Sequence, residues 1–414
     1  MRTRKTTMTN GARLVARRLD ELGRVSEEAD RLTRTFLSPA MARANARVAG
    51  WMRAAGMTVR EDEAGNVIGR SEGARPGAKT LLLGSHLDTV RNAGRFDGAV
   101  GVVLPIVALA ELRRRGVELP FAVEVLGFSE EEAVRFAGAY LGSKAYAGRL
   151  TAADLQLRDA RGISLREAIE AHAGRRFVLP KAAHAKRELL GYVEVHIEQG
   201  PVLEAEGLAV GVVTAIASQT RGRIVFRGKA GHAGTTPMGL RKDALAGAAE
   251  FVLAVEKQAR GEASLVATVG TIAVSGGASN VIPGETVLSL DVRHPGDATC
   301  ARAVKALITR GREIAKMRGL GFEWEETMRS PATRCARPLV RLLNRSVAAV
   351  QGRSLELVSG AGHDAVVMAK LTEAAMLFVR CRDGLSHHPD EYASPADLGV
   401  ALRVLEDFLE RMAR

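Results

Sequence analysis

The fold is decided by residues 80–132, which run TLLLGSHLDTVRNAGRFDGAVGVVLPIVALAELRRRGVELPFAVEVLGFSEEE. Thr80 to Leu87 is a short apolar run that predicts a buried strand, and Ala99 to Arg115 predicts a helix that ends at Gly116. Phe121 to Ser129 predicts a second strand. Strand, helix and strand in this order form a βαβ unit. We therefore predict a parallel sheet whose polar residues gather at the carboxyl ends of its strands.

Further α/β elements are expected on both sides of this unit. Apolar residues at helical spacing predict helices, and short apolar or alternating runs predict strands. They are helices at Asn10 to Leu22, Met41 to Ala55, Pro338 to Gln351 and Pro395 to Arg411, and strands at Tyr192 to Glu198 and Ala375 to Cys381.

Between these parts, from about Val212 to Glu326, the pattern changes to that of a compact insert. We expect two helices on one open, four-stranded antiparallel sheet. The elements that can be located are strands at Arg223 to Arg227, Ser264 to Val274 and Thr286 to Arg293, and helices at Asp243 to Arg260 and Cys300 to Arg318. The predicted fold class is α/β, with a main domain of residues 1–212 and 328–414 interrupted by an α+β domain of residues 213–327.

The charge balance argues against a nucleic-acid partner, although 59 Lys and Arg face 47 Asp and Glu, a net charge of +12. The arginines are scattered along the chain, and aromatic residues make up only 4% of it. Stacking platforms for bases need aromatic side chains among the basic ones. We therefore predict a solvated basic surface and no nucleic-acid binding.

Membrane insertion and secretion are also not expected. No apolar run reaches the roughly 18 residues that a membrane span needs, and no apolar stretch follows the basic residues of Met1 to Asn10. Cys300, Cys335 and Cys381 share no metal-type spacing and leave an odd thiol, which favours a reducing compartment. A cytoplasmic location is the prediction.

Candidate metal ligands follow the predicted strands. His86, Asp88 and Asp97 follow the first strand, Glu130 to Glu132 end the next, and His196 and His387 lie in later polar loops. A single histidine at a strand end is more often structural, and a run of glutamates is more often a solvated surface. Imidazoles and carboxylates gathered at the ends of several strands are instead the ligand set of zinc, manganese or cobalt.

Eight motifs carry a resemblance to a known family. They are Gly84 to Val90 (GSHLDTV), Gly94 to Gly98 (GRFDG), Phe128 to Phe136 (FSEEEAVRF), His196 to Glu204 (HIEQGPVLE), Gly231 to Met238 (GHAGTTPM), Asn280 to Gly284 (NVIPG), Ser359 to Asp364 (SGAGHD) and Gly384 to Glu391 (GLSHHPDE). In this order they resemble the amidase, or hydantoinase/carbamoylase, branch of the dinuclear metallopeptidase superfamily. The resemblance spans nearly the whole chain and implies a catalytic domain with two divalent metal ions, zinc or manganese with cobalt or nickel as options. It also implies an inserted lid domain through which a homodimer forms.

The resemblance assigns roles in the metal centre. His86, Asp97 and His196 would hold one metal, and Asp97, Glu132 and His387 would hold the other, with Asp97 as the bridge. Asp88 would orient His86 through the far ring nitrogen. Glu131 would act as the general base and then deliver the proton to the departing nitrogen. Ala133 departs from the pattern, since close relatives usually carry glycine there, and alanine does not easily adopt a positive φ.

The resemblance also assigns substrate contacts. A ureido acid presents a carboxylate, which guanidinium and amide groups bind well. The matching positions are Gln199, Arg221, Asn280, Arg293 and Gly360, together with His232, which would reach the active site of the partner subunit and stabilise the oxyanion.

The implied reaction is hydrolysis of a ureido C–N bond in a small ureido acid. Gly127 to Ser129, Val134 to Phe136 and Met376 to Arg382 look most like allantoate amidohydrolases, which convert allantoate to ureidoglycine, ammonia and carbon dioxide. Hydrolysis of an N-carbamoyl-L-amino acid, or of a β-ureido acid as in β-ureidopropionase, is the nearest alternative. A metal-free binding or assembly protein on the same scaffold is a further alternative, but such a protein would have lost a metal ligand or the general base. A peptidase is less suitable, because family peptidases often carry a carboxylate where this chain has His196.

Overall fold

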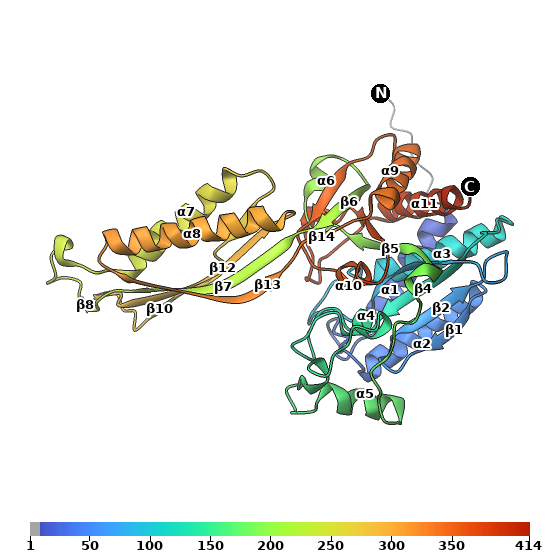
Figure 1. Ribbon diagram of the computed structural model, residues 1–414, viewed down its shortest axis with the longest axis horizontal. Coiled ribbons are helices and arrows are strands. Elements are labelled where there is room, and N and C mark those ends of the chain that lie inside the picture. Colours follow the sequence, from blue (N-terminus) through green and yellow to red (C-terminus); the bar gives the residue numbers. More distant parts are fainter. Residues whose placement is uncertain (1–8) are drawn as a thin grey trace. The chain divides into compact units, whose positions relative to one another are not determined.

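The computed structural model describes residues 9–414, so the basic residues 1–8 considered above lie outside it. The chain forms two compact units (Figure 1). The first runs up to Thr214 and resumes at Cys335, and the second is Ala215–Arg334. The chain thus leaves its first unit and returns to it.

The larger sheet has nine strands in the order β1-β2-β4-β3-β5-β16-β6-β14, with β15 paired to β6. The strands are β1 (Thr58–Glu61), β2 (Val67–Ser71), β3 (Thr80–His86), β4 (Ala122–Phe128), β5 (Leu189–Ile197), β6 (Val210–Ile216), β14 (Thr333–Arg334), β15 (Glu356–Ser359) and β16 (Ala374–Val379). The central strands β4, β3, β5 and β16 are mutually parallel, and β2 and β6 join them antiparallel on either side. The prediction of a mainly parallel sheet is confirmed.

The predicted βαβ unit consists of β3, α3 (Ala99–Arg114) and β4. α3 is buried around most of its circumference, as expected of a helix with apolar residues on nearly every side. The other helices of the first unit are α1 (Asn10–Gly23), α2 (Pro39–Ala54), α4 (Leu141–Tyr146), α5 (Leu165–Ala173), α6 (Val202–Ala205), α9 (Arg337–Gln351), α10 (Ala365–Met368) and α11 (Pro395–Met412). α1, α3, α9 and α11 share one apolar core with the sheet.

The second unit has a smaller antiparallel sheet in the order β10-β12-β7-β13, with β9 also paired to β12. Its elements are β7 (Ser218–Arg227), β8 (Gly231–His232), α7 (Ala244–Arg260), β9 (Val266–Thr268), β10 (Ile272–Ser275), β11 (Val281–Ile282), β12 (Glu285–His294), α8 (Asp297–Met317) and β13 (Gly321–Ser330). α7 and α8 cover one face of this sheet around a core that includes Phe226, Phe251 and Leu290. The other face carries exposed charged residues of β7.

Two details of this unit differ from the predicted elements. The strand expected from Ser264 to Val274 is interrupted, so that β9 and β10 occupy the same edge of β12 as two short strands. β13 was not located from the sequence. Its charged residues, Glu323, Glu325 and Glu326, mask the alternation that marks a half-buried strand.

Among residues 9–414, no helix combines the length and the apolar character that crossing a membrane requires.

Candidate metal centre

The parallel strands bring the predicted ligands to one edge of the larger sheet. β3 ends at His86, β4 leads into the loop of Glu131 and Glu132, and His196 lies near the end of β5. His387 lies in the segment between β16 and α11. Because parallel strands end at the same edge, residues that are up to 301 positions apart in sequence can meet there.

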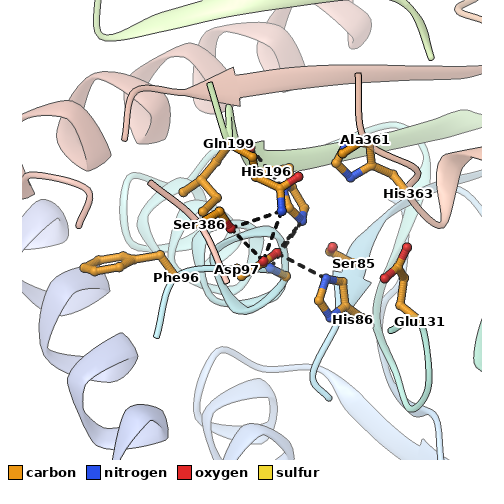
Figure 2. A network of polar contacts seen from close by, with 12 residues as sticks. Ser85, His86, Phe96, Asp97, Glu131, His196, Gln199, Ala361, His363 and Ser386 are labelled. Atoms are coloured by element: carbon orange, nitrogen blue, oxygen red, sulfur yellow. Dashed lines mark hydrogen bonds and ion pairs between the residues drawn. The ribbon is translucent and has the colours of Figure 1, made fainter. Parts of the chain in front are cut away.

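Asp97 lies at the centre of this group (Figure 2). Its Oδ1 lies 3.1 Å from Nε2 of His196 and 3.5 Å from Nε2 of His86. Its Oδ2 lies 3.2 Å from Nε2 of His387, which is 3.5 Å from Oε1 of Glu132. One oxygen of the Asp97 carboxylate therefore faces His86 and His196, and the other oxygen faces His387.

Among the described residues there are four groups of potential ligands, and two of them contain Asp97. One is His86, Asp97 and His196, and the other is Asp97, Glu132 and His387. In each group one nitrogen or oxygen atom per residue lies within 4.8 Å of the others. The structure thus brings together both sets that the resemblance assigned to two metal ions.

The ring orientations suit cations better than a hydrogen-bond network. Nδ1 of His86 lies 3.0 Å from the carbonyl oxygen of Asp88, and Nδ1 of His196 lies 2.9 Å from that of Ile197. Those contacts assign the proton to Nδ1 and leave both Nε2 atoms unprotonated beside Asp97, where Nε2 of His196 also lies 3.3 Å from the backbone N–H of Gly98. Oδ1 of Asp97 is buried and has no hydrogen-bond partner among residues 9–414. Lone pairs that face a common point in this way fit a divalent cation.

The backbone around these ligands is held in unusual conformations. Gly98 has φ +62°, and a Cβ there would come within 2.5 Å of the His86 ring. Ala133, Gln199 and His387 also have positive φ values, between 56° and 58°. Ala133, which stands where close relatives usually carry glycine, nevertheless has φ +58°, so the turn keeps a conformation that suits glycine and strains alanine. Such strained residues persist where surrounding structure holds them, commonly at functional sites.

Asp88 connects two of the loops. Its Oδ1 lies 3.5 Å from Nδ1 of His86, and its Oδ2 accepts hydrogen bonds from the backbone N–H of Glu131 and Glu132, each at 3.1 Å. A carboxylate behind a ligand imidazole fixes the ring and its tautomer. Asp88 also fixes the loop that carries Glu131 and Glu132.

The carboxyl groups of the centre have shifted pKa values. Burial opposes the ionisation of Asp97, but its contacts with His196, His387 and His86 prevail and hold its pKa well below the usual value. Burial raises the pKa of Glu131 well above its usual value, and burial with the charge of Asp97 raises that of Glu132 to about 7. Carboxylates crowded in this way require compensating positive charge, which divalent cations supply.

Several residues of the centre were not predicted. Glu391 accepts hydrogen bonds from the backbone N–H of Phe96 and Asp97, at 2.9 and 3.0 Å, and so holds the bridging loop. Ser386 Oγ lies 2.9 Å from Asp97 and 3.0 Å from Glu391. Both residues belong to the motif that contains His387, but only the folded chain reveals what they contact.

A second layer lies behind His196, and it includes Ser359 and His363 of the motif Ser359 to Asp364. The His363 ring packs edge-on to the His196 ring with centroids 4.4 Å apart, and its Nε2 lies 2.8 Å from Ser359 Oγ. Glu194, two residues before His196, accepts hydrogen bonds from Ser85 Oγ and the N–H of Ala365. The period-two alternation of a strand places Glu194 and His196 on one face, which is the signal that could have identified Glu194.

The predicted substrate contacts fall into separate groups. Gln199 lies in the centre and donates a hydrogen bond to Asp97 at 3.1 Å, while its Oε1 is buried without a partner among the described residues. Gly360 lies in the loop between β15 and α10 of the first unit. Arg221 and Arg293 both contact Asp291 in the second unit.

His232 and Asn280 form another group within the second unit. His232 pairs with Val281 in the two-stranded ribbon of β8 and β11, next to Asn280. The ribbon precedes β12, and the nine residues from Glu285 to Arg293 span about 27 Å of strand. In one chain, Arg293 and Asn280 are therefore too far apart to hold the same small carboxylate.

The chain is similar to known proteins over most of its length. A family model described as Peptidase family M20/M25/M40 matches residues 82–411. The chain belongs to that family. The M20 family comprises metal-dependent hydrolases, in agreement with the candidate ligand groups of this chain. The resemblance inferred from the motifs is confirmed.

Relatives within the M20 family cover almost the whole chain. Allantoate deiminase of Arabidopsis thaliana is 40% identical, over 95% of this chain and 81% of the relative. The N-carbamoyl-L-amino acid amidohydrolase of Geobacillus stearothermophilus is 39% identical, over 98% of this chain and 100% of the relative. A solved hydantoinase/carbamoylase-family amidase from Burkholderia multivorans superposes with a TM-score of 0.92 at 33% identity, covering 98% of this chain and 99% of that one. This member of the M20 family is a hydrolase acting on C–N bonds.

Proposed function

We propose that the protein hydrolyses a ureido C–N bond of a small ureido acid and that allantoate is its preferred substrate. The observation that carries the proposal is the pair of ligand groups sharing Asp97, with the buried carboxyl of Glu131 beside them. The relatives named for allantoate and for N-carbamoyl-L-amino acids support ureido chemistry. The segments Gly127 to Ser129 and Met376 to Arg382 look most like those of allantoate amidohydrolases and therefore favour allantoate as the substrate.

Two divalent cations, zinc or manganese with cobalt or nickel as options, would be held by the two groups. His86 and His196 would bind one, Glu132 and His387 the other, and Asp97 both. When bound, such cations polarise the ureido carbonyl and increase the acidity of water.

Glu131 is the proton carrier in this proposal. Its carboxyl group is buried, shares a potential ligand group with His86 and Glu132, and belongs to neither of the two groups that contain Asp97. As general base it accepts the proton of the attacking water, and as general acid it donates that proton to the departing nitrogen. Burial raises its pKa, which makes it a stronger base once ionised.

Polar groups of the chain suit a ureido acid. The buried Oε1 of Gln199 lacks a donor among the described residues, and a ureido N–H group would provide one. Arg221 and Arg293 would bind the substrate carboxylate, because guanidinium groups match its geometry. Gly360 would contribute its backbone to the pocket.

A homodimer would complete the site. Because Asn280 and His232 lie together at one end of the second unit's sheet and Arg293 near the other, they could contact one small substrate only from different subunits. His232 from the partner subunit would then stabilise the oxyanion. We place the enzyme in the cytoplasm, where the three free cysteines would remain reduced.

Hydrolysis of N-carbamoyl-L-amino acids is the second candidate, because the Geobacillus relative is almost as similar as the allantoate deiminase. Steady-state rates on allantoate and on N-carbamoyl-L-methionine, with manganese and separately with zinc, distinguish the two. We expect a higher kcat/KM on allantoate. A preference of about tenfold for the carbamoyl amino acid would overturn the choice of substrate, and hydrolysis of neither would overturn the function.

A further inference from the structure

Four polar side chains meet on the face of the second unit's sheet that the helices do not cover. Arg221 on β7 lies directly opposite Asp291 on β12, and Gln219 lies opposite Arg293 in the same register. Residues two apart on a strand share a face, so these four side chains form a square.

Asp291 is the centre of the square. It accepts hydrogen bonds from Arg221 Nε at 2.9 Å and from Gln219 Nε2 at 2.9 Å, both on Oδ2. Arg293 donates through Nε to Oδ1 at 2.9 Å and through Nη2 to Oδ2 at 2.7 Å. One carboxylate thus holds two guanidinium groups and an amide, and the square keeps a net charge of +1.

Another arginine on the same face has the opposite charge balance. Arg227 contacts both Glu285 and Glu323, so that two carboxylates surround one guanidinium. A surface ion-pair network needs no surplus cation, whereas a binding site for a single carboxylate does. The surplus positive charge therefore distinguishes the square from its neighbour on the sheet.

We propose that Asp291 restricts the substrate to ureido acids with a single carboxylate, by neutralising one of the two arginines that bind it. The inference rests on the proposed role of Arg221 and Arg293. With one net positive charge, the square balances one substrate carboxylate, and a second negative charge has no counterpart within the square. Allantoate fits this limit because its second ureido group is uncharged.

The test compares two ligands that differ only in one charge, N-carbamoyl-L-asparagine and N-carbamoyl-L-aspartate. Each is measured as a substrate or as a competitive inhibitor of ureido-acid hydrolysis by the metal-loaded enzyme. The measured quantity is the ratio of their inhibition constants or KM values. We expect the wild type to favour the asparagine compound.

Asp291→Asn raises the charge of the square to +2 and should shift the ratio toward the aspartate compound by about fivefold, given charges several ångström apart near a protein surface. Arg221→Gln lowers it to zero and should shift the ratio the other way, whatever its effect on affinity. Glu323→Gln makes the same charge change as Asp291→Asn. Glu323 pairs with Arg227 and lies opposite Val225, four residues or about 14 Å along the strand from Arg221, which is beyond the screening length. This variant should leave the ratio unchanged.

A merely structural Asp291 would weaken both ligands equally, so an unchanged ratio in Asp291→Asn and Arg221→Gln would overturn the inference. Should Asp291→Asn fail to fold, Arg221→Gln decides alone. If the wild type hydrolysed no ureido acid at all, the proposed function would fail instead, and the two failures are therefore distinguishable.

Discussion

Both carboxylate oxygens of Asp88 accept a hydrogen bond from the backbone N–H of Glu131, at 3.0 and 3.1 Å. The same carboxylate faces Nδ1 of His86 at 3.5 Å. One side chain therefore sets the position of a proposed metal ligand and of the proposed general base relative to each other. The loops after β3 and β4 are thereby joined at the point where the chemistry would occur.

Replacing Asp88 by Asn should weaken metal binding by about 10- to 100-fold, the usual effect of removing a carboxylate behind a ligand imidazole. The asparagine amide has only one oxygen to accept from the N–H groups of Glu131 and Glu132. Its NH2 group, where Asp88 has a second oxygen, would face an N–H donor and repel it. Competition with a chelator of known affinity measures the change. Asp243→Asn, which keeps its cap on the N–H of Ala246, serves as the control. Metal affinity within threefold of wild type in Asp88→Asn would contradict this role.

Glu131→Gln should keep its metal content but lower kcat by at least about 100-fold, because the amide cannot carry the proton. Metal analysis and steady-state kinetics on the same preparation check both parts. Glu132→Gln is the informative contrast, since it should lose metal as well as activity. Unchanged turnover in Glu131→Gln would remove this residue from the mechanism.

Ala133→Gly should stabilise the protein by about 0.5–1 kcal/mol. Glycine relieves the cost of a positive φ, about 1–2 kcal/mol, while adding a smaller entropy to the unfolded chain. Ala301→Gly, at an exposed position inside α8, should instead destabilise by about 1 kcal/mol. Denaturant unfolding of both variants measures the difference, and two changes of the same sign would refute the argument.

Glu124 should make stability depend on acid pH. Burial alone would raise its pKa, but His184, Tyr146 and Arg70 lower it to about 2 from an ordinary value near 4.5. The stabilisation from a carboxylate with a lowered pKa is complete above pH 4.5 and is lost as the pH falls toward 2. The margin of the wild type over Glu124→Gln in the free energy of unfolding should shrink by up to about 2 kcal/mol between pH 6 and pH 3.

Denaturant unfolding of the two metal-free proteins at both pH values measures this margin. Glu323→Gln, in which an exposed carboxylate is lost, should show little change between them. A margin that stays constant from pH 6 to pH 3 would show that Glu124 does not carry the effect.

Mixing inactive His232→Ala and Glu131→Gln chains should restore part of the activity. Each mixed dimer would contain one site with both an intact Glu131 and an intact His232, if His232 acts across the dimer. Activity measured on purified heterodimers checks this. Heterodimers as inactive as either parent would place His232 in its own subunit's site or outside the mechanism.

The local pattern of residues was sufficient to predict the elements whose burial is one-sided or complete. The apolar runs of β3 and β4 and the helix between them need no partner to be recognised. β13 was missed because charged residues occupy much of it, and its pairing with β7 is a non-local property. The break between β9 and β10 likewise depends on the neighbouring strand β12.

For the site, the sequence by itself determined which residues could be metal ligands, because residue types and the order of motifs can be read without knowing the fold. Only the tertiary structure decided that Asp97 faces His86, His196 and His387 together, and that Glu391, Ser386 and Asp88 hold the loops around it. It also decided that Arg221 and Arg293 share Asp291. Such contacts join residues from separate strands and loops, and their distances are set by sheet order and register rather than by spacing along the chain.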